Sequence, residues 1–153
     1  MKAVLQRVTR ASVKVEGNIV GSCGEGLMIL LGVATGDSEE DARFLAEKIC
    51  KLRIFCDEND KMNLSVKDID GEALVVSQFT LMANYRHGNR PDFLESASPD
   101  EANRLYEYFA QLISAQLKHV GMGVFGANME VELINDGPVT IVMDSEVLKK
   151  KKA

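Results

Sequence analysis

The chain has 153 residues, of which 46% are hydrophobic and 27% are charged, and its formal net charge at pH 7 is -5. This length suits one compact domain with a real core. The acidic balance argues against broad, non-specific wrapping of nucleic acid by the whole surface. The longest uncharged apolar stretch, residues 27–33, is too short to span a bilayer, and the first residues contain no apolar core of a signal peptide. We therefore expect a cytoplasmic protein.

The first 33 residues are predicted to form β-strands. Residues 2–8 and 11–16 alternate apolar and polar side chains, as half-buried strands do. Gly17 and Asn18 are typical of a hairpin turn, which leads into a strand over residues 19–22. Residues 26–33 form a continuous apolar run, which predicts a strand that is buried on both faces.

A helix and a second group of strands follow. Ser38 and the acidic residues after it are typical of a helix start, and apolar residues at helical spacing extend the predicted helix to Leu52. Short strands are expected at residues 53–56 and 62–66, around an acidic turn. A stronger strand is expected at residues 73–79.

A polar loop over residues 84–96 carries His87 between two arginines, and we expect a plain surface role for this histidine. Ser98 and Pro99 then open a second helix, with an apolar stripe behind them; two glycines, Gly121 and Gly123, are expected to end it. His119 is expected at the surface, at the end of this helix.

Two strands, residues 129–134 and 139–144, would close the chain as a hairpin. The order of elements predicts an α+β domain: a curved, mostly antiparallel sheet or open β-barrel with two covering helices. Residues 1–145 form this single domain, and residues 146–153 add a lysine-rich tail that we expect to be solvated.

The three cysteines, Cys23, Cys50 and Cys56, are odd in number and contain no CxxC pair. This argues against a disulfide framework and against a zinc site, so we expect free, buried thiols. We predict no metal and no cofactor.

The segment Ser77-Gln78-Phe79-Thr80-Leu81 places two hydroxyls and an amide where a buried strand would normally stop. Three interpretations are open. The hydroxyls could bond the backbone at a strand end, or one could act as a nucleophile if a base approached it. Alternatively, the backbone N–H groups of Phe79 and Thr80 could hold an oxyanion.

A second unusual segment is Asn135-Asp136-Gly137-Pro138-Val139-Thr140. Gly and Pro commonly mark turns. A cis Gly137–Pro138 bond would also aim two consecutive carbonyl oxygens in one fixed direction. Rigid carbonyls can test the handedness of a ligand, because each combines a hydrogen-bond acceptor with a steric wall.

Taken with their surroundings, these two segments resemble those of the D-aminoacyl-tRNA deacylases over nearly the whole chain. The other matching motifs occur in the same order, at residues 6–8, 11–13, 26–27, 31–33, 61–64, 90–91, 93, 97–99 and 129. The resemblance implies a cytoplasmic homodimer that hydrolyses the ester between a D-amino acid and tRNA. It also implies the removal of glycine from a wrongly charged tRNA.

The resemblance further implies roles for individual residues. Catalysis is assigned to Ser77, Gln78, Phe79 and Thr80, and the substrate pocket to Leu81, Phe125 and Met129. Gly137 and Pro138 are implied to enter the partner subunit's site, where they reject L-aminoacyl groups, and Arg7 is implied to fix their orientation. The 2'-hydroxyl of the tRNA is implied to help activate the attacking water.

Two other classes of function stay open at this point. The chain could be a binding module that holds a tRNA end or a nucleotide without catalysis. It could also be a conventional serine or threonine hydrolase, with Thr80 as the nucleophile.

Overall fold

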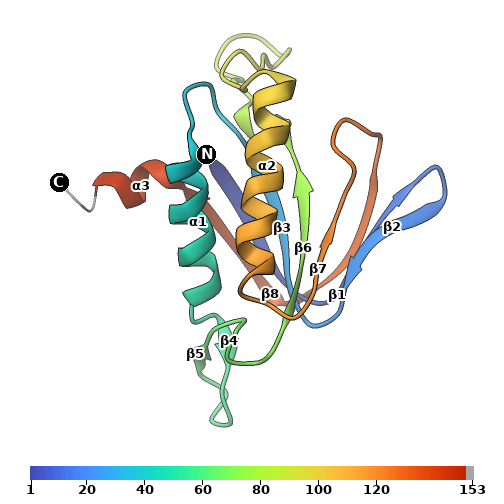
Figure 1. Ribbon diagram of the computed structural model, residues 1–153, viewed down its shortest axis with the longest axis vertical. Coiled ribbons are helices and arrows are strands. Elements are labelled where there is room, and N and C mark those ends of the chain that lie inside the picture. The colour runs from blue at the N-terminus through green and yellow to red at the C-terminus, as the bar shows by residue number, and fades with distance from the viewer. Residues whose placement is uncertain (151–153) are drawn as a thin grey trace.

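A strongly curved sheet, with two helices packed on one face, forms the framework of the molecule (Figure 1). The computed structural model describes residues 1–150 and, of Lys150, the backbone only. The main sheet consists of β1 (Lys2–Val15), β2 (Asn18–Cys23), β3 (Gly26–Gly32), β6 (Glu72–Ser77), β7 (Val120–Met122) and β8 (Glu130–Asp144). The other elements are α1 (Glu39–Lys51), β4 (Phe55–Cys56), β5 (Met62–Leu64), the 3-10 helix η1 (Phe79–Met82), α2 (Pro99–Ser114) and α3 (Ser145–Lys150).

The long strand β1 organises the sheet. It pairs antiparallel with β2 and β3 on one edge and with β8 along the other edge. Beyond β3, the strands β6 and β7 add in parallel. The sheet is therefore mostly antiparallel, as the sequence predicts.

The curvature of the sheet brings its two ends close together. A side chain at Gly21 in β2 would collide with the carbonyl of Met122 in β7, and one at Gly121 would collide with Ser22. These two glycines are required because the backbones of β2 and β7 approach so closely. The result is a nearly closed sheet.

The first helix has the start that the sequence predicts. Ser38 is the N-cap of α1, and its backbone N–H donates to Oδ2 of Asp41 at 2.9 Å in a capping box. The face of α1 that contains Ala42, Leu45 and Ile49 is fully buried against the sheet. A second, smaller apolar cluster, which includes Val8, fills the other face of the sheet.

The C-terminal region differs from the prediction in two places. Residues 129–144 do not form a hairpin, because β8 runs continuously along β1 and passes through Gly137–Pro138 without reversing. The second helix ends at Ser114, whereas Gly121 lies in β7 and Gly123 just after it. His119 therefore lies beyond the helix, with Nε2 2.8 Å from the carbonyl oxygen of Ser22.

The start of the lysine-rich tail is folded, which corrects the expectation that it is solvated. Ser145–Lys150 forms α3, which packs on α1. Lys149 Nζ lies 2.8 Å from Oδ1 of the buried Asp41, and the Ser145 hydroxyl donates to the same oxygen at 2.7 Å. The remaining tail residues, 151–153, lie outside the described part of the chain.

Of the three cysteines, Cys23 and Cys50 are buried, whereas Cys56 is exposed, so the expectation of burial is wrong for Cys56. No helix within residues 1–150 is both long and apolar enough to cross a membrane.

Candidate active site

A cavity of about 530 Å³ opens at the end of β6. It brings together five of the residues singled out in the sequence, from two separate parts of the chain: Ser77, Gln78, Phe79, Phe125 and Met129. The rest of its lining comes from β6, from the loop before α2 and the start of α2, from the segment before β8 and from β8 itself, with Val76, Ser96, Ala97, Pro99, Ala102, Gly126, Ala127, Asn128 and Val131.

The backbone at the rim leaves the sheet abruptly. The N–H of Gln78 makes the last bond to β3, donating to the carbonyl oxygen of Leu31 at 2.8 Å. The chain then turns into η1, and within residues 1–150 the N–H groups of Phe79 and Thr80 have no hydrogen-bond partner. Two adjacent donors without partners form an arrangement that can receive a negatively charged oxygen.

The Phe79 side chain is held beside these amides. Its ring packs edge-on against the ring of Phe93, with 5.1 Å between the centroids, and 54% of the residue stays exposed. This geometry is typical of a favourable aromatic pair. An exposed apolar ring at the mouth of a cavity offers a surface to an incoming ligand.

The hydroxyl groups have no general base next to them. Thr80 Oγ1 accepts a hydrogen bond from the side-chain amide of Gln78. No hydrogen bond joins Ser77 or Thr80 to a histidine or carboxylate in the part of the chain that the structure describes. A serine or threonine nucleophile needs such a partner, so the geometry does not favour a conventional hydrolase triad.

Two of the predicted residues lie apart from the cavity wall. Thr80 is exposed on η1 but does not line the cavity. Leu81 does not line it either: its Cβ faces β3, 3.0 Å from where a Cβ on Gly32 would stand. Leu81 thus supports the turn from behind.

Tyr106 in α2, whose role the sequence analysis missed, joins α2 to β6 and to the segment before β8, next to residues that line the cavity. Its hydroxyl donates to the carbonyl oxygen of Val75 at 3.0 Å and is 3.3 Å from that of Gly123. Burial raises the pKa of Tyr106 to about 12, so the hydroxyl keeps its proton as a donor. The ring also packs near Phe125, with 6.2 Å between the centroids.

The Gly137–Pro138 bond is cis, and both residues are exposed. Residues 136–139 are absent from the pairing register of β8 with β1, so the segment bulges out of the ladder. Gly137 has φ +132°, and a Cβ there would stand 2.9 Å from Val139 Cγ2 and 3.1 Å from Arg7 Nη2. Only glycine fits this position without strain.

Two side chains hold the bulge. Arg7 Nε donates to the carbonyl oxygen of Asp136 at 3.0 Å, and its Nη1 donates to that of Ile54 at 2.8 Å. On the other side, Asn135 Oδ1 accepts from the N–H of Val139 at 3.0 Å. Asn135 thus bridges the Gly-Pro pair, a role that its neighbours in the sequence do not reveal.

The bulge and the cavity lie at different ends of the sheet. Arg7 pairs with Leu27, and Leu27 pairs with Ala73, so the bulge is level with the start of β6. Ser77, at the cavity, is four residues further along β6, roughly 13 Å at 3.3 Å per residue, and two strands separate β6 from β8. The Gly-Pro pair of one chain does not line that chain's own cavity.

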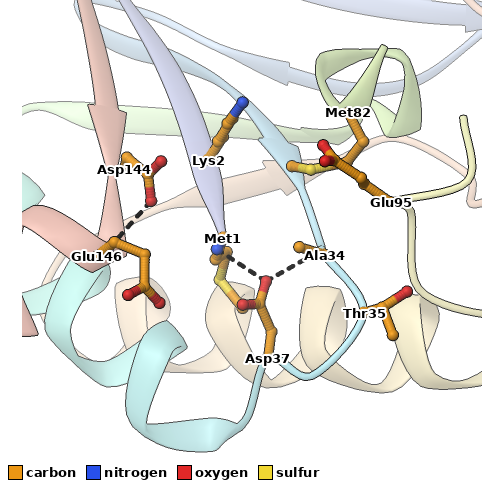
Figure 2. Close-up of a pocket in the computed structure, with 9 residues that line it drawn as sticks. All are labelled: Met1, Lys2, Ala34, Thr35, Asp37, Met82, Glu95, Asp144 and Glu146. Atoms are coloured by element: carbon orange, nitrogen blue, oxygen red, sulfur yellow. Dashed lines mark hydrogen bonds and ion pairs between the residues drawn. The ribbon is translucent and has the colours of Figure 1, made fainter. Parts of the chain in front are cut away.

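A second cavity, of about 300 Å³, surrounds the chain start (Figure 2). Here Asp37 Oδ2 lies 2.8 Å from the Met1 ammonium and accepts from the N–H of Ala34 at 2.7 Å. The Ser145 hydroxyl is a further acceptor for the ammonium, at 3.1 Å. These groups satisfy one another, and no cluster of side chains suited to a metal ion occurs among the described residues.

The family model and the curated relatives point to one family. The family model described as D-Tyr-tRNA(Tyr) deacylase matches residues 4–144. A D-aminoacyl-tRNA deacylase of Caldicellulosiruptor saccharolyticus is 58% identical over 146 residues, which is 95% of this chain and 98% of that protein. Another, from Dictyoglomus turgidum, is 53% identical over 152 residues, covering 99% and 97% of the two chains.

Two solved structures are also similar. One, titled c-Myc DNA Unwinding Element Binding Protein, has a TM-score of 0.89 at 41% identity and covers 94% of this chain and 98% of that one. The other, a probable eukaryotic D-amino acid tRNA deacylase, has a TM-score of 0.78 at 16% identity, covering 93% and 97%. At that identity, the second likeness shows the fold alone.

Proposed function

This chain belongs to the D-Tyr-tRNA(Tyr) deacylase family and is an ester hydrolase that acts on D-aminoacyl-tRNA; from this premise we propose that the cavity at the end of β6 is where the ester is cleaved. The observation that carries this proposal is the pair of partnerless N–H groups of Phe79 and Thr80 at the cavity rim. The interpretation as a binding module without catalysis is set aside, because the close relatives are enzymes.

In the proposed reaction, the ester carbonyl oxygen lies against these two N–H groups. A water molecule attacks the carbonyl carbon, and the negative charge that develops on the oxygen is stabilised by donors that are already in place. Removal of one such donor in other enzymes costs about 10²- to 10³-fold in rate. The C–O bond to the tRNA ribose then breaks, the ribose oxygen takes up a proton, and the free amino acid leaves.

The protein side chains position the substrate in this scheme. Gln78 and Thr80, joined by their hydrogen bond, hold the turn that presents the amides. Because no base contacts Ser77 or Thr80 in the described chain, the 2'-hydroxyl of the terminal ribose is the group proposed to assist the attacking water. Phe125 and Met129 form the apolar wall of the pocket.

We assign the discrimination between D- and L-aminoacyl groups to the Gly137–Pro138 bulge of a second copy of the chain. The bulge is rigidly held, is exposed, and is roughly 13 Å along the strand direction from its own cavity, so its carbonyls are available to a partner. In a homodimer they would accept from the substrate's α-amino group and collide with an L side chain. Glycine has no side chain to collide and would be hydrolysed as well.

The test is hydrolysis of matched D- and L-tyrosyl-tRNA by catalytic amounts of the protein. We expect rapid loss of the D ester only. Gly137→Ala should lower the preference for the D ester and allow L-tyrosyl-tRNA to be cleaved, because the added Cβ displaces the bulge. Gly17→Ala is the matched control, since Gly17 also has a positive φ (+80°) but has no atom within 4 Å of the added Cβ.

Two outcomes would contradict the proposal. If wild type cleaved both esters equally, or if Gly137→Ala kept full selectivity, the bulge would not control handedness. If Thr80→Ala abolished turnover while Gln78→Ala, which breaks the same hydrogen bond, kept it, Thr80 would be a nucleophile, and the backbone mechanism would be wrong.

A further inference from the structure

The loop between η1 and α2, residues 83–98, is yellow-green in Figure 1. Phe79, shortly before this loop, and Ser96 and Ala97, at its end, line the cavity. The base of the loop is closed by two backbone hydrogen bonds between Asn84 and Asp92, of 2.8 and 3.0 Å. Next to this base, Phe93 packs on Phe79. The loop is therefore fixed beside the N–H groups to which we assign the ester oxygen.

The loop is locally basic in a chain with a net charge of -5. Between Asn84 and Asp92 it contains Arg86, His87 and Arg90 and no acidic residue. All three side chains are exposed. The carboxylate of Asp92, at the base of the loop, accepts a hydrogen bond at Oδ1 from the N–H of Leu94 at 3.2 Å and makes no ion pair with either arginine within residues 1–150.

These two arginines differ from every other arginine of the chain. Arg7, Arg10, Arg43, Arg53 and Arg104 each donate to a carboxylate, a carbonyl oxygen or a hydroxyl. Within residues 1–150, Arg86 and Arg90 have no hydrogen bond or ion pair through their guanidinium groups. Glu95 lines the same hollow as Arg86 without pairing with it.

We propose that Arg86 and Arg90 bind the phosphate backbone of the tRNA's single-stranded end and so position the ester in the cavity. This inference rests on the proposed function for the location of the ester. Because the ester is on the terminal ribose, the preceding phosphates must leave the cavity over its rim. Guanidinium groups suit this contact, since their planar donors match phosphate oxygens.

An exposed aromatic side chain lies in the same loop as these two arginines. Tyr85, beside Arg86, is 81% exposed. Exposed aromatic rings beside cationic side chains are typical of single-strand binding, where the ring stacks on a base and the charge holds the backbone. The part of the loop from Asn84 to Asp92 thus offers both kinds of contact without lining the cavity itself.

The test compares Arg86→Ala/Arg90→Ala with a control of equal charge change, Arg43→Ala/Lys118→Ala, whose two residues lie in α1 and between α2 and β7 and do not line the cavity. The first readout is binding of uncharged tRNA over a range of salt concentrations. Each phosphate contact on a single strand contributes about 0.7 to the slope of log K against log salt. We expect the loop variant to bind at least about tenfold more weakly and its slope to fall by about 1.4, with the control unchanged.

The second readout is hydrolysis of D-tyrosyl-adenosine, an ester without phosphates. The loop variant should cleave it at the wild-type rate while losing kcat/KM on D-tyrosyl-tRNA. Arg86→Lys/Arg90→Lys should restore most of the salt slope, because it restores the charge. The binding readout needs no catalysis, so failure of the proposed ester mechanism would not affect it.

Three results would overturn the inference. The first is unchanged tRNA affinity and salt slope in the loop variant. The second is an equal loss of activity on both esters, which would mean that the loop supports the cavity itself. The third is dissociation of the oligomer in sedimentation, which would mean that the arginines contact a second copy of the chain.

Discussion

The buried carboxylate of Asp41 should control the acid stability of the protein. Asp41 has no exposed surface and accepts hydrogen bonds from the Ser145 hydroxyl, from Lys149 Nζ and from the N–H of Ser38. The substitution Asp41→Asn removes the negative charge while keeping the shape of the side chain. It therefore disrupts the junction of α1 with α3 without opening a cavity.

The size of the stabilisation by ionised Asp41 follows from the shift of its pKa on folding. Burial by itself raises the pKa of Asp41, but the hydrogen bonds from Lys149, Ser145 and Ser38 lower it more, from 3.8 to about 2. At about 1.4 kcal/mol per pKa unit, the ionised form contributes about 2 kcal/mol to the free energy of unfolding. A folded-state pKa below the unfolded value gives stability that is present above about pH 4 and is lost as the pH falls toward 2.

The assay is urea unfolding of wild type and Asp41→Asn at pH 7, 5 and 3, at one protein concentration. At pH 7 we expect the variant to be about 2 kcal/mol less stable, which is about 4–8 °C in Tm for a chain of this size. At pH 3, which lies between the folded and unfolded pKa values, the difference should narrow to about half of its value at pH 7. Glu47→Gln, on the exposed face of α1, is the control and should match wild type throughout. A constant difference between wild type and Asp41→Asn from pH 7 to pH 3 would refute the reasoning.

Three other variants test the supports of the site. Tyr106→Phe should cost about 1–3 kcal/mol in urea unfolding, since it removes the donor from two carbonyl oxygens, whereas an unchanged midpoint would show that these bonds contribute nothing. Asn135→Ala leaves the N–H of Val139 unpaired and should reduce the preference for D- over L-tyrosyl-tRNA, measured as a ratio of initial rates. Gly123→Ala would place a Cβ 2.7 Å from Met129 Sδ; it should raise KM for the D ester, and an unchanged KM would exclude Met129 from the pocket wall.

The elements with strong local signals were predictable from the sequence. Ser38 with the acids behind it predicts the start of α1, and the structure confirms this start. The apolar runs that become β3 and β6 were also found at nearly their observed bounds. In each case the residues that decide the structure are close neighbours in the sequence.

The sequence-based prediction of secondary structure was wrong where contacts between residues far apart in the sequence determine the fold. Gly137 and Pro138 are typical of a turn, but β1 supplies partners on both sides of them, so the strand continues through a bulge. The strand β7 was missed because it has only three residues and a central glycine. Its place is set by β6 and by its close approach to β2.

In the candidate site, too, the residues with a local sequence signal were predictable, whereas those that act through long-range contacts were not. The segment around Ser77 and the Gly-Pro pair stand out as local anomalies, and the sequence points to both. Tyr106 and Asn135 do not stand out, because a tyrosine in a helix stripe and an asparagine near a turn are ordinary. Their roles depend on which carbonyl oxygen or N–H group folding brings within reach.

The pairing of β1 with β8 also constrains how the protein is made. Arg7 donates to the carbonyl oxygen of Asp136, which is 129 positions later in the chain. The strand β1, which is synthesised first, therefore cannot complete its pairing until β8, near the end of the chain, has been synthesised. Until residues 130–144 leave the ribosome, one edge of β1 has no partner, and open strand edges favour aggregation. Pairing across such a long separation is also slow. A nascent chain that stalls before this last strand would therefore carry the cavity residues of β6 without the bulge, at the stage when it is most exposed to proteases and chaperones.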